Sequence, residues 1–253
     1  MKEEVIIRYI RKIAALLSEH INDRSYRDVQ RKHYNCLEED FRIKFKQEII
    51  AKSALFVMKK KYSLWCVDEE GIPTDKMKTT GLELVRSDSP EAVRPRLKAV
   101  MEMILKGAPD TEIATIVEKF KTELYSVMPE EIAVNVGISN ISKYSDNGVA
   151  TKGAPWHVKG ALNYRFLLKD LKLEGQYDDI EEGAKAKVVY VKKNIYKLES
   201  IAFQRWPVEF ETVVKVDYST MVEKYFTAKV STLLEPMNKQ ALLTFQGALD
   251  AFF

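Results

Sequence analysis

The spacing of apolar residues changes several times along this chain, and the change restricts the fold more than any other feature. Between residues 5 and 21 the apolar side chains recur at every third or fourth position, which is typical of an amphipathic helix. Between residues 132 and 138 they alternate with other residues, as in a strand with one buried face. A chain that contains both spacings is predicted to fold as an α+β protein.

Capping and turn residues extend this prediction along the sequence. Helices are expected at 5–21, 24–40, from about 90 to a stop at Gly107, 110–124, 156–168 and 221–233. Strands are expected at 41–50, 54–58, 62–67, 132–138, 187–191 and 195–203, with hairpin turns at 69–71 and 192–194. Residues 1 to about 85 therefore mix helices with short strands, and the rest is mostly helical with a β-ribbon.

Composition and missing motifs exclude several classes of protein. The chain has 40 Lys and Arg against 37 Asp and Glu, so its net charge of +3 does not by itself indicate nucleic-acid binding. No apolar run approaches the roughly 20 residues of a membrane span, and two cysteines are too few for a disulfide scaffold. Gly-rich phosphate loops, Gly-x-Ser-x-Gly and Asp-x-Asp are absent. We therefore expect no catalytic residue and no metal site in this chain.

A basic run from Lys59 to Tyr62 is the first candidate for binding. It is predicted to begin a strand, so Lys60 and Tyr62 would share one face of that strand. Nucleic-acid phosphates are suitable anions for such a run. A solvated strand edge, protected from aggregation by its lysines, is the alternative interpretation.

Several blocks of sequence together resemble family-B DNA polymerases, most closely those of T-even bacteriophages. Residues 59–64 and 81–83 resemble the end of the palm, where a Lys-x-Tyr motif contacts primer–template DNA. Residues 89–93 resemble the first thumb helix, and residues 141–144 with 154–160 resemble the loop and helix that grip the duplex backbone. The resemblance covers nearly the whole chain and is weakest in residues 1–40.

The resemblance implies three parts, with the C-terminal part of the palm at 1–85, the thumb at 86–235, and a linker with a tail at 236–253. It implies that eight residues bind DNA: Lys60, Lys61, Tyr62, Lys143, Tyr144, Lys152, His157 and Lys159. For His157 the alternative to DNA contact is a structural role, as a buried histidine with its hydrogen bonds satisfied within the protein. Lys159 stands where relatives have an arginine, which replaces a bidentate fork with a point charge.

The catalytic motifs of the family, Asp-x-x-Ser-Leu-Tyr-Pro and Asp-Thr-Asp, are absent. The chain is therefore expected to be a C-terminal subunit or fragment of a DNA-directed DNA polymerase, a nucleotidyltransferase that is inactive alone. Its partner chain would carry the exonuclease, the fingers, the palm aspartates and Mg²⁺, and this chain would hold no cofactor. The expected location is the cytoplasm of an infected bacterial host, without membrane contact.

The last eight residues have the pattern of a sliding-clamp-binding peptide. A short helical turn would place an aliphatic and an aromatic pair on one side and let a glutamine bond the rim of the clamp pocket. The predicted clamp-binding residues are Gln246, Leu249, Phe252 and Phe253. A polar linker at 238–240 would let the tail leave the thumb, whereas a tail folded back onto its own domain is the alternative.

A second function fits the same sequence, namely a non-enzymatic clamp-binding DNA adaptor that regulates replication. An exposed apolar patch on residues 1–60, suited to pairing with the rest of a polymerase, would favour the polymerase. A self-sufficient monomer would favour the adaptor.

Overall fold

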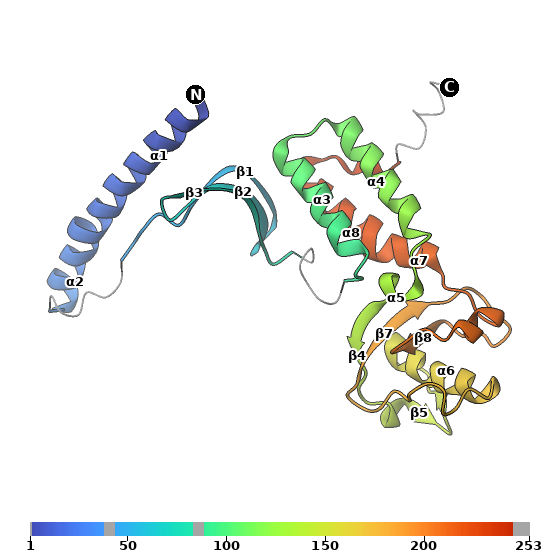
Figure 1. The fold of residues 1–253 in the computed structure, drawn as a ribbon. Helices are drawn as coiled ribbons and strands as arrows, with labels where there is room; N and C mark the ends of the chain where they lie inside the picture. The colour runs from blue at the N-terminus through green and yellow to red at the C-terminus, as the bar shows by residue number, and fades with distance from the viewer. Residues whose placement is uncertain (1, 38–43, 83–88, 245–253) are drawn as a thin grey trace, which may run out of the picture. The chain divides into compact units, whose positions relative to one another are not determined.

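The computed structural model describes residues 2–37, 44–82 and 89–244, and the chain divides into two compact units (Figure 1). Unit 1 consists of Met1–Leu55 and Tyr62–Thr80, and unit 2 consists of Phe56–Lys61 and Gly81–Phe253. Both units combine helices with short strands, so the prediction of an α+β protein is confirmed.

Unit 1 begins with a long helical segment. Helix α1 (Lys2–Glu19) passes through a π-helical stretch (His20–Tyr26) into α2 (Arg27–Tyr34), and the helix predicted at 5–21 is confirmed. Helix α2 ends at Tyr34 because Asn35 takes a left-handed conformation with φ of +49° and its N–H donates to the carbonyl of Gln30. The prediction that this helix runs on to residue 40 is wrong for the described residues 35–37.

A three-stranded sheet completes unit 1. Its strands are β1 (Ile49–Met58), β2 (Lys61–Glu69) and β3 (Ile72–Thr80), in the order β1-β2-β3. Strands β2 and β3 are antiparallel, with Tyr62 opposite Thr80 and Glu69 opposite Ile72. Between them, Glu70 and Gly71 have φ of +53° and +87°, which fits a type I′ turn and confirms the predicted hairpin.

Two details of this sheet correct the sequence prediction. Residues 44–48 form no strand, because both backbone groups of Phe45 bond to the carboxamide of Asn22, each at 2.7 Å, and have no strand partner. Lys60 lies in the turn between β1 and β2 with φ of +63° and is not a strand residue. The prediction that Lys60 and Tyr62 share a strand face is therefore wrong.

One part of unit 2 is helical. Helices α3 (Val93–Lys106) and α4 (Asp110–Leu124) pack together and against a continuous segment formed by α7 (Tyr218–Val222), a π-helical stretch (Glu223–Thr227) and α8 (Ala228–Leu234). Gly107, at φ of +73°, ends α3 as predicted. The fully buried core of this part comprises Val93, Leu97, Val100, Met101, Leu124, Met221, Phe226, Val230 and Leu234.

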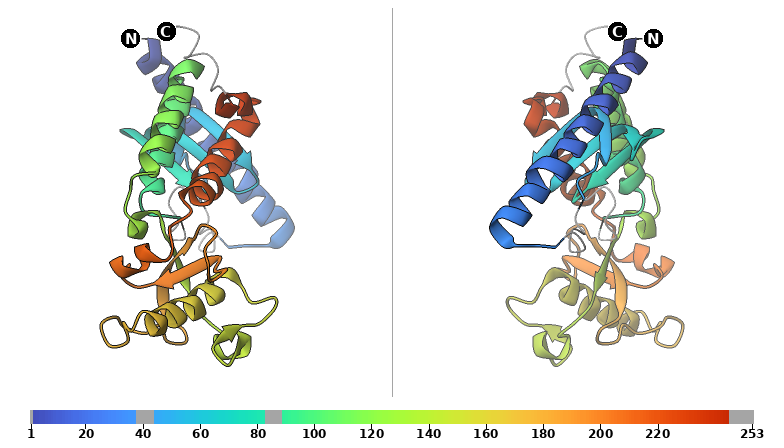
Figure 2. Two further views of the ribbon diagram at one scale, coloured as in Figure 1. Left: turned by 90° about the vertical axis from the view of Figure 1, so that its right-hand side faces the viewer. Right: turned by 90° about the vertical axis from the view of Figure 1, so that its left-hand side faces the viewer.

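The other part of unit 2 is a sheet covered by one helix. Antiparallel strands β4 (Val134–Gly137), β7 (Lys185–Tyr190) and β8 (Ser200–Phe203) follow the short helix α5 (Pro129–Ile132), and α6 (Trp156–Asp170) packs on β8. Figure 2 shows this sheet and α6 at one end of unit 2 and α3, α4 and α8 at the other. A small hairpin, β5 (Ser145–Asp146) with β6 (Val149–Ala150), precedes α6.

The predicted β-ribbon has a longer connection than expected. Strand β8 begins only at Ser200, so residues 195–199 are not part of a strand. The side chain of Asn194 bonds the carbonyls of Lys192 and Leu198 and the N–H of Leu198, at 2.8–3.1 Å. These bonds close residues 191–199 into a compact loop in place of the predicted turn at 192–194.

Candidate nucleic-acid interface

Five of the predicted DNA-binding residues lie between β4 and the end of the first turn of α6. We call this stretch, residues 139–159, the basic segment. Its first end is anchored at Ile138, a fully buried residue. The N–H of Ile138 donates to the carbonyl of Ala184 at 2.8 Å, and the N–H of Gly183 donates to the carbonyl of Ile138 at 2.7 Å. The basic segment therefore leaves the sheet from a fixed point.

Glu182 holds the start of the basic segment. Its carboxylate accepts the backbone N–H of Asn140 and, at 2.8 Å, the N–H of Ile141. A 3₁₀ turn over Ser142–Tyr144 follows directly, and within it the N–H of Tyr144 donates to the carbonyl of Ile141 at 3.2 Å. Glu182 is not among the predicted site residues, because nothing local to its acidic stretch indicates bonds to residues about 40 positions earlier.

The β5–β6 hairpin then brings the two ends of the loop together. Asn147 and Gly148, both with positive φ, form its turn, and the N–H of Thr151 donates to the carbonyl of Tyr144 at 2.9 Å. Lys143 is exposed, with its ammonium 5.4 Å from the centre of the Tyr144 ring, and Lys152 is also exposed. The structure thus brings Lys143, Tyr144 and Lys152 into one surface region.

The first turn of α6 holds the other two predicted residues of the segment. His157 is half-buried, and this burial lowers the pKa of its imidazole below the ordinary value of 6.5, which favours the neutral form at pH 7. The ammonium of Lys159 lies 2.9 Å from the carboxylate of Glu199, so part of its charge is already balanced. Trp156 is a packing residue, because it stacks on Tyr190 with ring centres 4.7 Å apart.

Lys60, Lys61 and Tyr62 form a separate group on the β1–β2 hairpin. Lys60 is exposed at the turn, whereas Lys61 and Tyr62 are the first two residues of β2 and are half-buried. Gly81 lies so close to the backbone carbonyl of Lys60 that a Cβ atom would overlap it, and its φ is +68°. This contact holds the turn that presents Lys60.

The acidic loop at 178–182 is bound to the fold. Arg165 contacts the carboxylate of Asp179 and the carbonyl of Ile180, both at 2.7 Å. The hydroxyl of Tyr164 donates to the carbonyl of Asp178 at 3.1 Å, and burial raises the pKa of Tyr164 to about 12. Within residues 2–37, 44–82 and 89–244, no three His, Cys, Asp or Glu residues gather in a way that could hold a metal ion.

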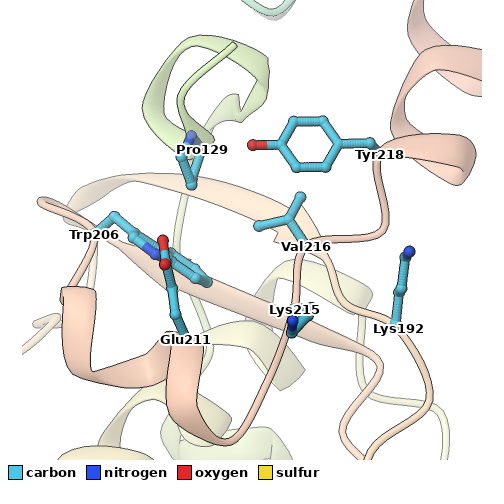
Figure 3. Close-up of a pocket in the computed structure, with 7 residues that line it drawn as sticks. All are labelled: Pro129, Lys192, Trp206, Glu211, Lys215, Val216 and Tyr218. Carbon is cyan, nitrogen blue, oxygen red and sulfur yellow. The ribbon is translucent and has the colours of Figure 1, made fainter. Parts of the chain in front are cut away.

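A cavity of about 310 Å³ lies elsewhere in unit 2 (Figure 3). Trp206 forms one wall; it is 5% exposed, and its buried indole N–H has no hydrogen-bond partner in the described part of the chain. The lining residues are Pro129, Lys192, Trp206, Glu211, Lys215, Val216 and Tyr218. Two ammonium groups and one carboxylate line this cavity, so its charge does not favour one class of ligand. The exposed basic segment is therefore the better candidate interface.

The predicted clamp-binding residues Gln246, Leu249, Phe252 and Phe253 lie outside the described residues. The linker before them is packed onto the fold. The ammonium of Lys239 lies 2.6 Å from the carboxylate of Asp110, and the 3₁₀ helix Gln240–Thr244 packs against α4. The polar residues 238–240 therefore do not themselves separate the chain from the helical part, since it stays on α4 through Thr244.

No helix among the described residues is long and apolar enough to cross a membrane.

The family model described as DNA polymerase family B matches residues 10–235. The DNA-directed DNA polymerase of Enterobacteria phage T4 is 24% identical over 188 residues, which cover 70% of this chain and 20% of the phage protein. For the DNA-directed DNA polymerase of Escherichia phage RB69 the identity is 29% over 182 residues, 66% of this chain and 19% of that protein.

The DNA polymerase of Thermococcus gorgonarius is 39% identical over 85 residues, 33% of this chain and 10% of that protein. This chain thus spans about a fifth or less of the length of the relatives that it matches. The family model, in contrast, covers most of this chain and includes both the β1–β2 hairpin and the basic segment. The chain belongs to DNA polymerase family B.

Proposed function

We propose that this chain is the C-terminal part of a replicative bacteriophage DNA polymerase, comprising the end of the palm (1–85), the thumb (86–235), and a linker with a clamp-binding tail (236–253). It grips primer–template duplex, and a partner chain carries the exonuclease, the fingers, the palm aspartates and the Mg²⁺ ions of nucleotidyl transfer. Membership of the family and the phage relatives support the polymerase role. The basic segment supports the proposed grip on duplex DNA, and helix α1 supports the proposed partner chain.

The basic segment is suited to phosphates. Lys143 and Lys152 are exposed, and among the described residues neither forms an ion pair, so both ammonium groups are available to anions. The segment offers exposed cations and half-buried aromatic rings. Contacts of this kind fix the position of a duplex without selecting its sequence.

The exposed apolar side of α1 carries the argument for a partner. Ile6, Ile13 and Leu17 are 57%, 55% and 55% exposed and recur at helical spacing, although such residues normally face a core. The apolar residues on this side are Val5, Ile6, Tyr9, Ile10, Ile13, Leu16 and Leu17. A continuous exposed stripe of this size is typical of an interaction surface, so the rest of the palm is the natural cover. This feature favours the polymerase over the adaptor.

The ions of two-metal catalysis need a cluster of carboxylates. The sequence lacks both aspartate motifs of the family, so in this proposal the partner chain holds these ions. The chain purified alone is expected to give no primer extension with Mg²⁺. Extension by a rigorously purified chain would contradict this part of the proposal.

Co-purification from the native source, followed by identification of the bound chain, tests the partner directly. The expected partner contains the two palm aspartate motifs, and mixing it with this chain should restore extension. Replacing Ile6 and Ile13 by Asp should abolish the association, while Ile195→Asp, an equally drastic change at an exposed loop residue of unit 2, should leave it intact. A monomeric chain that binds DNA and a clamp but no polymerase chain would instead support the adaptor.

A further inference from the structure

One carboxylate from a distant loop is bonded to two consecutive backbone N–H groups at the start of the basic segment. One oxygen of Glu182 accepts the N–H of Asn140, and the other accepts the N–H of Ile141 at 2.8 Å. The residues are about 40 positions apart in the sequence, so this contact depends on the tertiary fold. Charge-assisted bonds to backbone N–H groups are among the strongest hydrogen bonds in proteins.

The backbone at this point is shaped to receive an anion. Asn140 has φ of +63°, in the left-handed region, and Ile141 is right-handed with φ of −56° and ψ of −48°. Successive residues of opposite hand point their N–H groups to the same side and form a concave anion site. Glu182 fills that site from within the protein.

Both sides of the contact are firmly connected. On one side, the N–H of Gly183 bonds the carbonyl of Ile138 at 2.7 Å, and the N–H of Ala184 bonds the carbonyl of Glu181 at 3.1 Å, so Glu182 itself is held in place. On the other side, Ile141 begins the 3₁₀ turn that carries Lys143 and Tyr144, and its carbonyl accepts the N–H of Tyr144 at 3.2 Å.

We propose that Glu182 is a positioning residue for duplex binding, which holds the 140–144 backbone so that Lys143 and Tyr144 meet the phosphates of DNA. This inference rests on the proposed function of the basic segment. It has an unusual consequence, because a negative charge beside a polyanion should weaken binding by charge alone. If Glu182 positions the turn, its removal weakens binding; if it acts only through its charge, its removal strengthens binding.

The test compares three variants of the full chain by duplex affinity over a series of salt concentrations. Glu182→Ala should bind duplex about tenfold more weakly. Without the carboxylate the 140–144 turn becomes ordered only when DNA binds, and the entropy lost in ordering it reduces the binding free energy. Its salt dependence should keep the slope of the unchanged chain, since no phosphate contact is removed. Glu182→Gln should bind with intermediate affinity, because an amide oxygen can accept one of the two N–H groups.

Glu181→Gln is the matched control. It removes the same charge from the adjacent residue, whose exposed side chain does not hold the turn, so its affinity should be unchanged or slightly higher. Amide hydrogen exchange at residues 140 and 141 provides a second reading, with faster exchange expected in Glu182→Ala and unchanged exchange in Glu181→Gln.

Equal or tighter duplex binding by Glu182→Ala, or unchanged exchange at residues 140 and 141, would overturn the positioning role. If Glu182→Ala does not fold, Glu182→Gln with the same two readings decides the question. Failure of the unchanged chain to bind any duplex would instead overturn the proposed function, while the exchange measurement would still report on the Glu182 contact.

Discussion

Gly160 of α6 lies directly against the backbone of Ala202 in β8, so that a Cβ atom at residue 160 would come within 2.8 Å of the Ala202 nitrogen. The same atom would lie 3.2 Å from the Ile201 carbonyl carbon and 3.2 Å from Cγ1 of Val188. A glycine at this position allows α6 to approach the sheet closely. Because α6 begins with Trp156 and carries His157 and Lys159 in its first turn, this contact also fixes where the basic segment ends.

Gly160→Ala is expected to destabilise unit 2. The new methyl group meets backbone atoms that cannot rotate away, so α6 must move, and overpacking of this kind costs about 1–3 kcal/mol of unfolding free energy. Denaturant unfolding followed by far-UV circular dichroism measures the change. Gly137→Ala is the control, because a Cβ there meets nothing within 4 Å. Equal stability of the two variants would show that α6 can shift without loss.

Asp68 should make the stability of unit 1 depend on acid pH. Its buried carboxylate loses hydration, but bonds from Gln47 at 2.7 Å, Gly71 at 2.9 Å and Arg11 at 2.6 Å outweigh that loss and hold the pKa of Asp68 below its ordinary value of 3.8. A carboxyl whose pKa is lower in the folded state stabilises the fold above its unfolded pKa. This contribution is lost as the pH falls below about 4 and passes through the folded pKa.

Asp68→Asn is expected to cost about 1.5–3 kcal/mol at pH 7, the range for hydrogen bonds to a charged group. It should also remove much of the pH dependence below 4, because the titrating group is gone. Hydrogen exchange of the β2 and β3 amides, measured from pH 7 to 3, reports on unit 1 alone. Asp28→Asn, at an exposed residue whose partner Lys32 is 3.9 Å away, should have almost no effect. A similar loss in both variants would contradict the assignment to Asp68.

Lys143→Ala should weaken binding to all duplex sequences alike. Removing one phosphate contact is expected to lower the slope of log affinity against log salt by roughly one. Fluorescence anisotropy with several duplexes, at salt concentrations of roughly 50–300 mM, measures the affinity for each sequence and its dependence on salt. Lys169→Ala, at the far end of α6, is the control. A change in sequence preference, or unchanged affinity at low salt, would show that this turn does not meet the backbone.

The tail Gln246–Phe253 is expected to bind a sliding clamp. Burial of two aromatic side chains and a leucine, less the cost of ordering a peptide, predicts micromolar affinity for the isolated tail, or about 8 kcal/mol. Deleting the tail should leave short-template synthesis by the reconstituted polymerase intact and shorten its products on long templates when the clamp is present. Titration of a labelled tail peptide against the cognate clamp measures the affinity.

The double variant Phe252→Ala, Phe253→Ala is the control for that titration. Equal binding by the double variant, or no binding by the native peptide at about 100-fold the expected dissociation constant, would refute the clamp assignment. Linkage to DNA held by the thumb should raise the apparent affinity further, since the second contact then forms within one complex.

Elements with strong local signals could be predicted from the sequence by itself. The helical spacing of apolar residues indicated α1 and α4, and the glycines indicated the end of α3 and the turn after Glu69, all of which the structure confirms. These features depend on residues within a few positions of one another. The motifs that indicated the polymerase family are also short and local, and the family match agrees with them.

Tertiary contacts decided the features that local patterns could not. Asn22 takes the backbone bonds of Phe45, 23 positions later, and prevents a strand there. Glu182 reaches across about 40 residues to hold the start of the basic segment. Periodicity describes which side of an element is apolar, but a hydrogen bond between distant residues exists only after the chain has folded. For that reason the sequence could predict the cations of the interface, whereas only the fold reveals what positions them.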